Sequence, residues 1–152
     1  MINLVLSLIA FLGLIAGWFI RKYTKEEIKS GKKYFIWLNK AIALVLILVL
    51  LYLNLNVYFL IIGIVLGYFI RQSYLYLGLV SFDFVNYFIF LFGLGYSALE
   101  KYSKKILILS FVMFFVGVLI ANIYKIDGYY SLVAGALLWR LLDAVPDKFR
   151  II

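Results

Sequence analysis

The chain has 152 residues, of which 67% are hydrophobic and 14% are charged, with a net charge of +8 and a mean hydropathy of +1.10. Soluble domains are about 45–50% apolar, and a soluble fold of this length has too little interior to hide so much apolar surface. Cysteine and histidine are both absent, which excludes disulfides, thiolate nucleophiles and the usual zinc and haem ligands. We therefore expect an all-α fold: a polytopic transmembrane helical bundle.

The apolar runs are long enough for several crossings of a bilayer, since one span needs about 20 residues. We expect one integral membrane domain over residues 1–152, with six helices preferred. The six spans are predicted over residues 2–20, 36–53, 57–79, 83–100, 106–124 and 129–144.

The first apolar run is followed, and not preceded, by positive charge, which indicates a retained span and not a signal peptide. The loop at residues 21–33 holds six of the fifteen basic residues, so we place it in the cytoplasm and the N-terminus outside. Thr24 and Glu27 have the spacing of a capping box, and Gly31 is suited to ending a short helix. The loop is thus predicted to contain one or two turns of interfacial helix.

Asn54 and Asn56 predict a tight external turn before the third span. We expect that span to be one long helix over residues 57–79, with Arg71 in its last third. Ser81 and Asp83 then give a helix-start signal for the fourth span.

Six crossings place Lys101, Lys104, Lys105 and the basic tail outside, which conflicts with the positive-inside rule. If residues 72–100 entered and left the membrane on one side, all these charges would be cytoplasmic. Five spans plus a re-entrant hairpin is therefore the alternative topology.

Small residues recur at a four-residue spacing, which favours close helix packing inside a bilayer. The pairs are Gly13 with Gly17, Gly63 with Gly67, Gly93 with Ser97, and Gly117 with Ala121, and Ala134, Gly135 and Ala136 flatten the last helix. We expect these pairs to pack against other helices of the same chain.

Ionisable groups are costly within a bilayer, so Arg71, Asp83 and Arg140 are the first candidates for a functional site. In the hairpin between the third and fourth helices, an extended Arg71 side chain can approach Asp83 or Asn86. The functional interpretation is a substrate or ion site between helices, with Arg71 and Arg140 contacting an anion. The structural interpretation is an arginine that reaches the interface and an aspartate that caps a helix.

The sequence favours no catalytic residue, no cofactor and no metal ligand set. Glu26 and Glu27 are adjacent, but a solvated loop does not separate their pKa values as catalysis requires. Tyr74 and Tyr76, with Phe82 and Phe84, either pack the bundle or line a cavity for an apolar ligand, and packing is the preferred use.

We expect a multi-pass cell-membrane protein that is not an enzyme, and that serves as a non-catalytic accessory or structural component. A small transporter or channel with a polar site between helices is the alternative. The expected partners are the lipid bilayer, anionic lipid headgroups at the basic loops, and a second copy or another membrane protein, but not nucleic acid.

Overall fold

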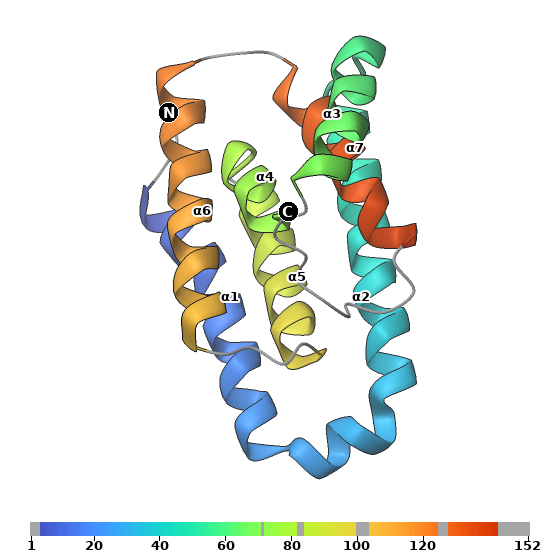
Figure 1. Cartoon of the computed structure of the whole chain (residues 1–152), viewed down its shortest axis with the longest axis vertical. Coiled ribbons are helices and arrows are strands. Elements are labelled where there is room, and N and C mark those ends of the chain that lie inside the picture. Colours follow the sequence, from blue (N-terminus) through green and yellow to red (C-terminus); the bar gives the residue numbers. More distant parts are fainter. Residues whose placement is uncertain (1–3, 71, 82–83, 100–103, 125–127, 143–152) are drawn as a thin grey trace.

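The computed structural model describes residues 4–70, 72–81, 84–99, 104–124 and 128–142. These ranges hold seven α-helices and no strands, which confirms the predicted all-helical class (Figure 1). The helices are α1 (Leu4–Tyr23), α2 (Lys25–Leu53), α3 (Val57–Phe69), α4 (Ser73–Leu79), α5 (Val85–Leu99), α6 (Lys104–Ile123) and α7 (Tyr129–Leu142). Within α1 and α2, the segments Val5–Tyr23 and Ser30–Leu53 are long and apolar enough to cross a membrane, and the other apolar helices are shorter.

The helix expected over residues 57–79 is broken in two, so this prediction was wrong. α3 ends at Phe69, the backbone leaves helical geometry at Ile70 (φ −109°, ψ 89°), and α4 begins at Ser73 after Gln72. The Leu75 N–H donates to the Gln72 carbonyl at 3.0 Å, which starts the new helix. Neither glycine nor proline marks the break in the sequence, and the two halves pack against different helices, α3 on α7 and α4 on α6.

The connection between α1 and α2 also differs from expectation. Gly31 lies inside α2, which continues unbroken to Leu53, and Thr24 precedes α2 without a side-chain capping bond. The Thr24 hydroxyl instead donates to the Ile20 carbonyl at 2.7 Å. One glycine costs a helix about 1 kcal/mol relative to alanine, which is less than the cost of abandoning the backbone ladder of a long helix.

The directions of the helices follow from which residues meet. Gly13 of α1 lies against Phe90 of α5, and Gly17 lies against Leu94, so α1 and α5 run parallel. By the same test α3 and α7 are parallel, since Gly63 meets Leu132 and Gly67 meets Ala136.

The short helix α4 runs the opposite way to α1. Its first turn places Tyr74 beside Phe11, and just beyond its end Ser81 contacts Ser7. α3 runs antiparallel to α2, because Ser131 of the parallel α7 bonds to Asn54 while Leu141 bonds to Lys40. α3 and α4 therefore run in opposite directions and form a helical hairpin, and Figure 1 shows α3 ending in the upper part of the bundle.

Glycine seams hold three pairs of helices at backbone contact, as predicted. A β-carbon on Gly63 would fall on the Leu132 carbonyl of α7, and one on Gly13 would fall on the Phe90 carbonyl of α5. Gly117 of α6 is equally close to the Leu75 carbonyl of α4, where its partner is Gly78. The small pairs at Gly13, Gly63 and Gly117 thus serve packing within this chain.

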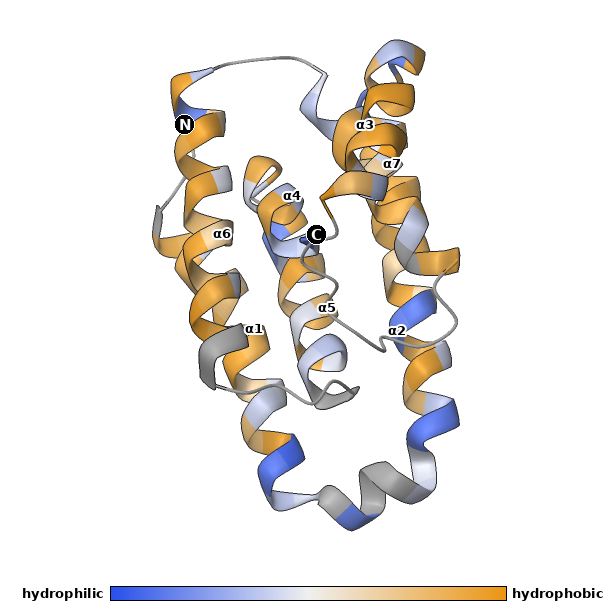
Figure 2. Ribbon diagram, in the orientation of Figure 1, coloured by the Kyte–Doolittle hydropathy of each residue, from blue (hydrophilic) through white to orange (hydrophobic). Residues whose placement is uncertain are grey.

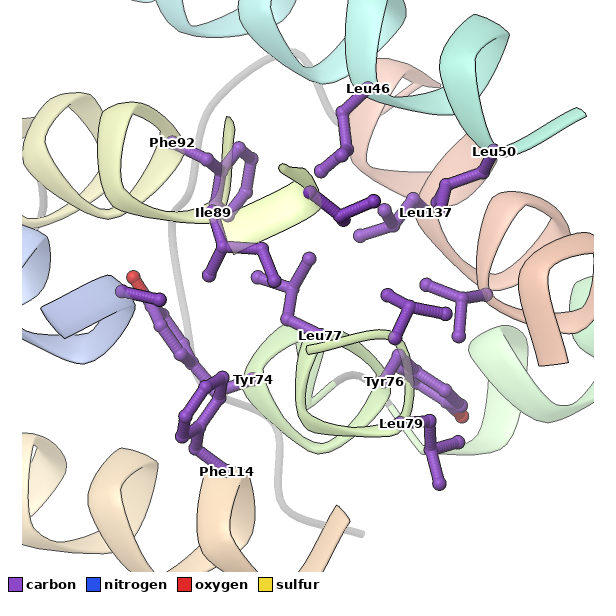
Figure 3. Packing of buried hydrophobic residues seen from close by; sticks show 14 of the residues in the cluster. Leu46, Leu50, Tyr74, Tyr76, Leu77, Leu79, Ile89, Phe92, Phe114 and Leu137 are labelled. Atoms are coloured by element: carbon purple, nitrogen blue, oxygen red, sulfur yellow. The ribbon is translucent and has the colours of Figure 1, made fainter. Parts of the chain in front are cut away.

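The core is centred on α4, whose residues from Tyr74 to Leu79 are buried except for the half-buried Leu75. Figure 3 shows Leu77 facing Ile89, while Tyr74 and Tyr76 extend to opposite sides of the helix. The core residues around them include Leu46, Leu50, Phe92, Phe114 and Leu137. Tyr74 and Tyr76 are therefore packing residues; Phe84 is 47% exposed, and Phe82 lies outside the described residues.

Candidate functional site

Of the four residues of the predicted polar site, the structure describes the side chain of one. Arg71 and Asp83 lie outside the described residues, and Arg140 is in the last turn of α7 with its side chain undescribed. Asn86 is in the first turn of α5 and is only 4% exposed. The predicted convergence of Arg71, Asp83 and Arg140 on one site therefore stays a prediction.

Asn86 belongs to a buried polar cluster with Ser7 and Ser81. The Ser81 oxygen lies 2.7 Å from Ser7 Oγ and 2.7 Å from Asn86 Oδ1. An amide oxygen only accepts hydrogen bonds and a hydroxyl has one hydrogen, so the Ser81 hydroxyl donates to Asn86 Oδ1 or to Ser7 Oγ, one at a time. The cluster joins α1, the end of α4 and the start of α5.

The amide nitrogen of Asn86 has no hydrogen-bond partner within the described ranges. It offers two N–H donors in a buried setting, and a buried donor without a partner costs about 1–3 kcal/mol. Such a group suits a water molecule or an acceptor oxygen of a small ligand. Ser7 was not predicted, since its partner is 74 residues away in the chain.

The tip of the α3–α4 hairpin combines exposed apolar side chains with two half-buried polar ones. Phe69 and Ile70 are 63% and 41% exposed, and Gln72 and Ser73 are half-buried. Opposite Gly67, just before the tip, lies Ala136, midway along α7 between Ser131, which bonds to Asn54, and Leu141, which bonds to Lys40 in the middle of α2.

One end of the bundle is strongly basic. Lys22, Lys32 and Lys33 are exposed and Arg21 is half-exposed there, and Figure 2 shows hydrophilic residues concentrated around the α1–α2 connection. Slightly further inside, Lys40 of α2 donates to the Leu141 carbonyl at 3.0 Å, near the end of α7. A cation at a helix C-terminus is favourable because the last carbonyls carry partial negative charge.

At the opposite end of the bundle, a clasp of hydrogen bonds through Ser131 joins α7 to the α2–α3 turn. The Ser131 hydroxyl accepts the Asn56 N–H at 2.7 Å and donates to the Asn54 carbonyl at 2.5 Å. The Asn56 side chain in turn caps α3 by accepting from the backbone N–H groups of Tyr58 and Phe59. The predicted Asn54–Asn56 turn is confirmed.

Trp139 fixes the hairpin to α7. Its indole N–H donates to the Ile64 carbonyl at 2.7 Å, and its ring packs on Tyr68 with the ring centroids 5.4 Å apart. Both contacts lie within two turns of the end of α3.

Within the described ranges, no three Asp, Glu, His or Cys side chains are grouped so that they could hold a metal ion. Comparison with protein-family models, with curated proteins and with solved structures finds no match to this chain.

Proposed function

We propose that the chain is a multi-pass integral membrane protein of the cell membrane. The outward faces of its helices support this proposal, because they carry large apolar side chains such as Leu48, Ile61 and Leu119 at more than half exposure. Figure 2 shows the same apolar character along the flanks of the bundle. Lipid is the solvent that makes such a surface favourable.

Aromatic side chains support the position of the bilayer along α2. Tyr34 and Trp37 are 80% and 68% exposed near one end, and Tyr52 is 91% exposed near the other. From Tyr34 to Tyr52 the helix rises about 27 Å at 1.5 Å per residue. This matches a hydrocarbon layer of about 30 Å with tyrosine and tryptophan at its two interfaces.

The proposed topology is five crossings plus a re-entrant hairpin. In a six-span bundle of alternating direction, the first and fourth spans would be antiparallel, whereas α1 and α5 are parallel. We propose that α1, α2, α5, α6 and α7 cross, and that α3 and α4 enter and leave on the side of the Asn54–Asn56 turn. The re-entrant segment thus precedes α5, unlike the 72–100 segment of the alternative predicted from sequence.

This topology removes the conflict with the positive-inside rule. It brings Lys104 and Lys105, at the start of α6, to the same side as Lys32 and Lys33 of α2. That side is then cytoplasmic, and its basic residues lie where anionic lipid headgroups attract them. The N-terminus of α1 lies outside.

Labelling of single cysteines tests the topology cleanly, because the chain has none of its own. Leu55→Cys reports the outer turn and Lys33→Cys the cytoplasmic side; both positions are exposed. Phe84→Cys distinguishes the two topologies. Five crossings predict that an impermeant thiol reagent labels it on intact cells together with Leu55→Cys, whereas six crossings predict labelling with Lys33→Cys after permeabilisation.

For the role of the protein, we propose a non-catalytic accessory or structural component of the membrane. Two observations support this. The side chains of α4 are buried and fill the centre of the bundle, and the connections between successive helices are short. Extraction in mild detergent is expected to bring a partner membrane protein with it. A single homogeneous species without a partner contradicts the accessory role.

A small transporter or channel is the second candidate, and the broken α3–α4 segment favours it. Transporters build their substrate sites from discontinuous helices that end near the bilayer midplane. Transport requires Arg71, Asp83 and Arg140 to share a water-accessible site with Asn86. Single alanine variants at these positions are expected to abolish transport in reconstituted vesicles.

A further inference from the structure

We propose that a single anionic phospholipid binds along the edge of α2 that faces α7, with its phosphate group between Lys33 and Lys40. The proposal rests on the membrane-spanning role of α2, which is the same whether the chain crosses five or six times. It goes beyond a general attraction of the basic end for anionic lipid, because it assigns one surface, two phosphate-binding side chains and a position for the hydrocarbon chain.

The two lysines lie on one side of α2. Lys33, Trp37 and Lys40 follow one another at intervals of four and three residues within an unbroken helix, and this spacing puts side chains on a common face. Lys33 and Lys40 are about 10 Å apart along the helix axis, with the exposed Trp37 between them. The long, flexible lysine side chains allow both ammonium groups to approach one phosphate at the level of Trp37.

The edge that these residues share is the one beside α7. Lys40 Nζ donates to the Leu141 carbonyl of α7 at 3.0 Å. Asn39, about 100° further round the helix, faces α5 instead, because its Oδ1 stands 3.1 Å from the position of a β-carbon on Gly95. Consecutive residues of α2 thus face different neighbours, which places the two lysines next to the seam between α2 and α7.

Lys40 has hydrogen-bond donors available for a ligand. An ammonium group carries three N–H donors, and the Leu141 carbonyl takes one of them. Lys40 is half-buried and lies about 4.5 Å further along the axis, toward the bilayer centre, than Trp37, whose indole marks the interface. A lysine at this depth extends its ammonium group back toward the headgroups, where a lipid phosphate accepts the remaining donors.

Beyond Lys40 the same edge of α2 becomes apolar. Leu44 and Leu48 follow at intervals of four residues and are 47% and 57% exposed. Leu48 lies about 12 Å further into the bilayer than Lys40. A phosphate group at the lysines therefore places a hydrocarbon chain along these two leucines, so one edge of the helix matches both parts of a phospholipid.

The charge of this end of the bundle favours a lipid with net negative charge. Arg21, Lys22 and Lys32 lie at the same end as Lys33, and Glu26 is the one acid among the side chains that the structure describes. Glu26 precedes Lys33 by seven residues, which is about 10 Å further from the bilayer. Lysines at a membrane surface attract anionic lipids, whereas a zwitterionic headgroup brings its own cation close to them.

Lipid binding to the purified protein in micelles of a neutral detergent tests the proposal, with native mass spectrometry counting the bound molecules. Wild-type protein is expected to retain phosphatidylglycerol in preference to phosphatidylcholine. Lys33→Met and Lys40→Met are each expected to weaken the binding of phosphatidylglycerol about fivefold, which is the effect of one lysine near an anionic lipid surface. Lys40→Arg, which keeps the charge and the donors, is expected to bind as tightly as the wild type.

Lys32→Met is the matched control, because it removes the same charge from the same end of α2 but from another face of the helix; it is expected to bind as the wild type does. Lys33 is exposed, so its substitution tests the site without loosening the bundle. An equal loss for Lys32→Met and Lys33→Met overturns the site in favour of diffuse attraction.

Two other outcomes also contradict the proposal. Equal retention of phosphatidylcholine and phosphatidylglycerol overturns the selection of anionic lipid, and displacement of the lipid by an equal concentration of inorganic phosphate indicates a site for free anions. None of these results alters the cysteine labelling at Leu55 and Phe84, so a failure of the proposed topology is seen separately.

Discussion

Substituting Gly78 by alanine tests whether α4 and α6 meet at backbone distance. A β-carbon at Gly78 would stand 3.0 Å from the Val118 nitrogen and closer still to the Phe114 carbonyl oxygen. Neither atom can rotate away, because both belong to the backbone of α6. Overpacking of this kind costs about 1–3 kcal/mol, and the helix preference for alanine returns about 1 kcal/mol. Because the clashing atoms are backbone, we take the overpacking cost at the upper end of its range and subtract the gain from alanine. Gly78→Ala is then expected to lower the free energy of unfolding by about 2 kcal/mol.

Gly31 of α2 provides the matched control. The nearest atoms to an added β-carbon there are in the Phe35 ring, 3.5 Å away, which is an ordinary van der Waals distance. Gly31→Ala is therefore expected to raise the free energy of unfolding by up to about 1 kcal/mol. The two variants should differ by about 3 kcal/mol, being the sum of these two effects.

The assay is unfolding in mixed micelles with increasing SDS, followed by the fluorescence of the three tryptophans. Gly78→Ala should unfold at a lower SDS fraction than the wild-type protein, and Gly31→Ala at an equal or higher one. If Gly78→Ala proves as stable as the wild type, α4 and α6 are not in backbone contact, and the position of α4 in the core is wrong.

Three further predictions use the same assay. Ser131→Ala should cost about 1–3 kcal/mol, because it leaves a backbone donor and a backbone acceptor of the α2–α3 turn without their partner; an unchanged midpoint excludes the clasp. Trp139→Phe should lower the free energy of unfolding by about 1 kcal/mol, because it removes the indole hydrogen bond to α3. Trp37→Phe, at an exposed position, should change that free energy by less than about 0.5 kcal/mol. Equal effects of the two substitutions would contradict the hydrogen bond. Lys40→Met should cost about 1 kcal/mol by removing a charged donor from the end of α7, and Lys33→Met should have no measurable effect; a loss for Lys33→Met as large as that for Lys40→Met argues that charge alone matters.

Sequence reasoning succeeded where the signal is local. Gly13, Gly63 and Gly117 were identified from spacing alone, because a small residue every fourth position makes a flat helix face whatever its partner. Asn56 was placed at a turn because its side chain bonds to its own neighbours in the chain.

The failures have a different physical origin. The break after Ile70 carries no glycine or proline, and the contacts of α3 with α7 and of α4 with α6 join residues far apart in the chain. Ser7 and Gly78 were overlooked as well, since their partners Ser81 and Phe114 are distant in sequence. The sequence predicted that residues 57–79 form one helix that crosses the bundle. Because the chain instead reverses direction after α3, the predicted directions of α5 and of the helices after it are opposite to the observed ones.

The two sides of each glycine contact are synthesised at different times. Gly13 of α1 has its partner at Phe90, about 80 residues further along, which a ribosome adds in about 4–15 s. During this interval the flat face of α1 has neither its seam partner nor bulky side chains of its own to cover it. The interval between the synthesis of Gly63 and that of its partner Leu132 is almost as long. The contact between α1 and α5 can therefore form only after more than half of the chain has been synthesised.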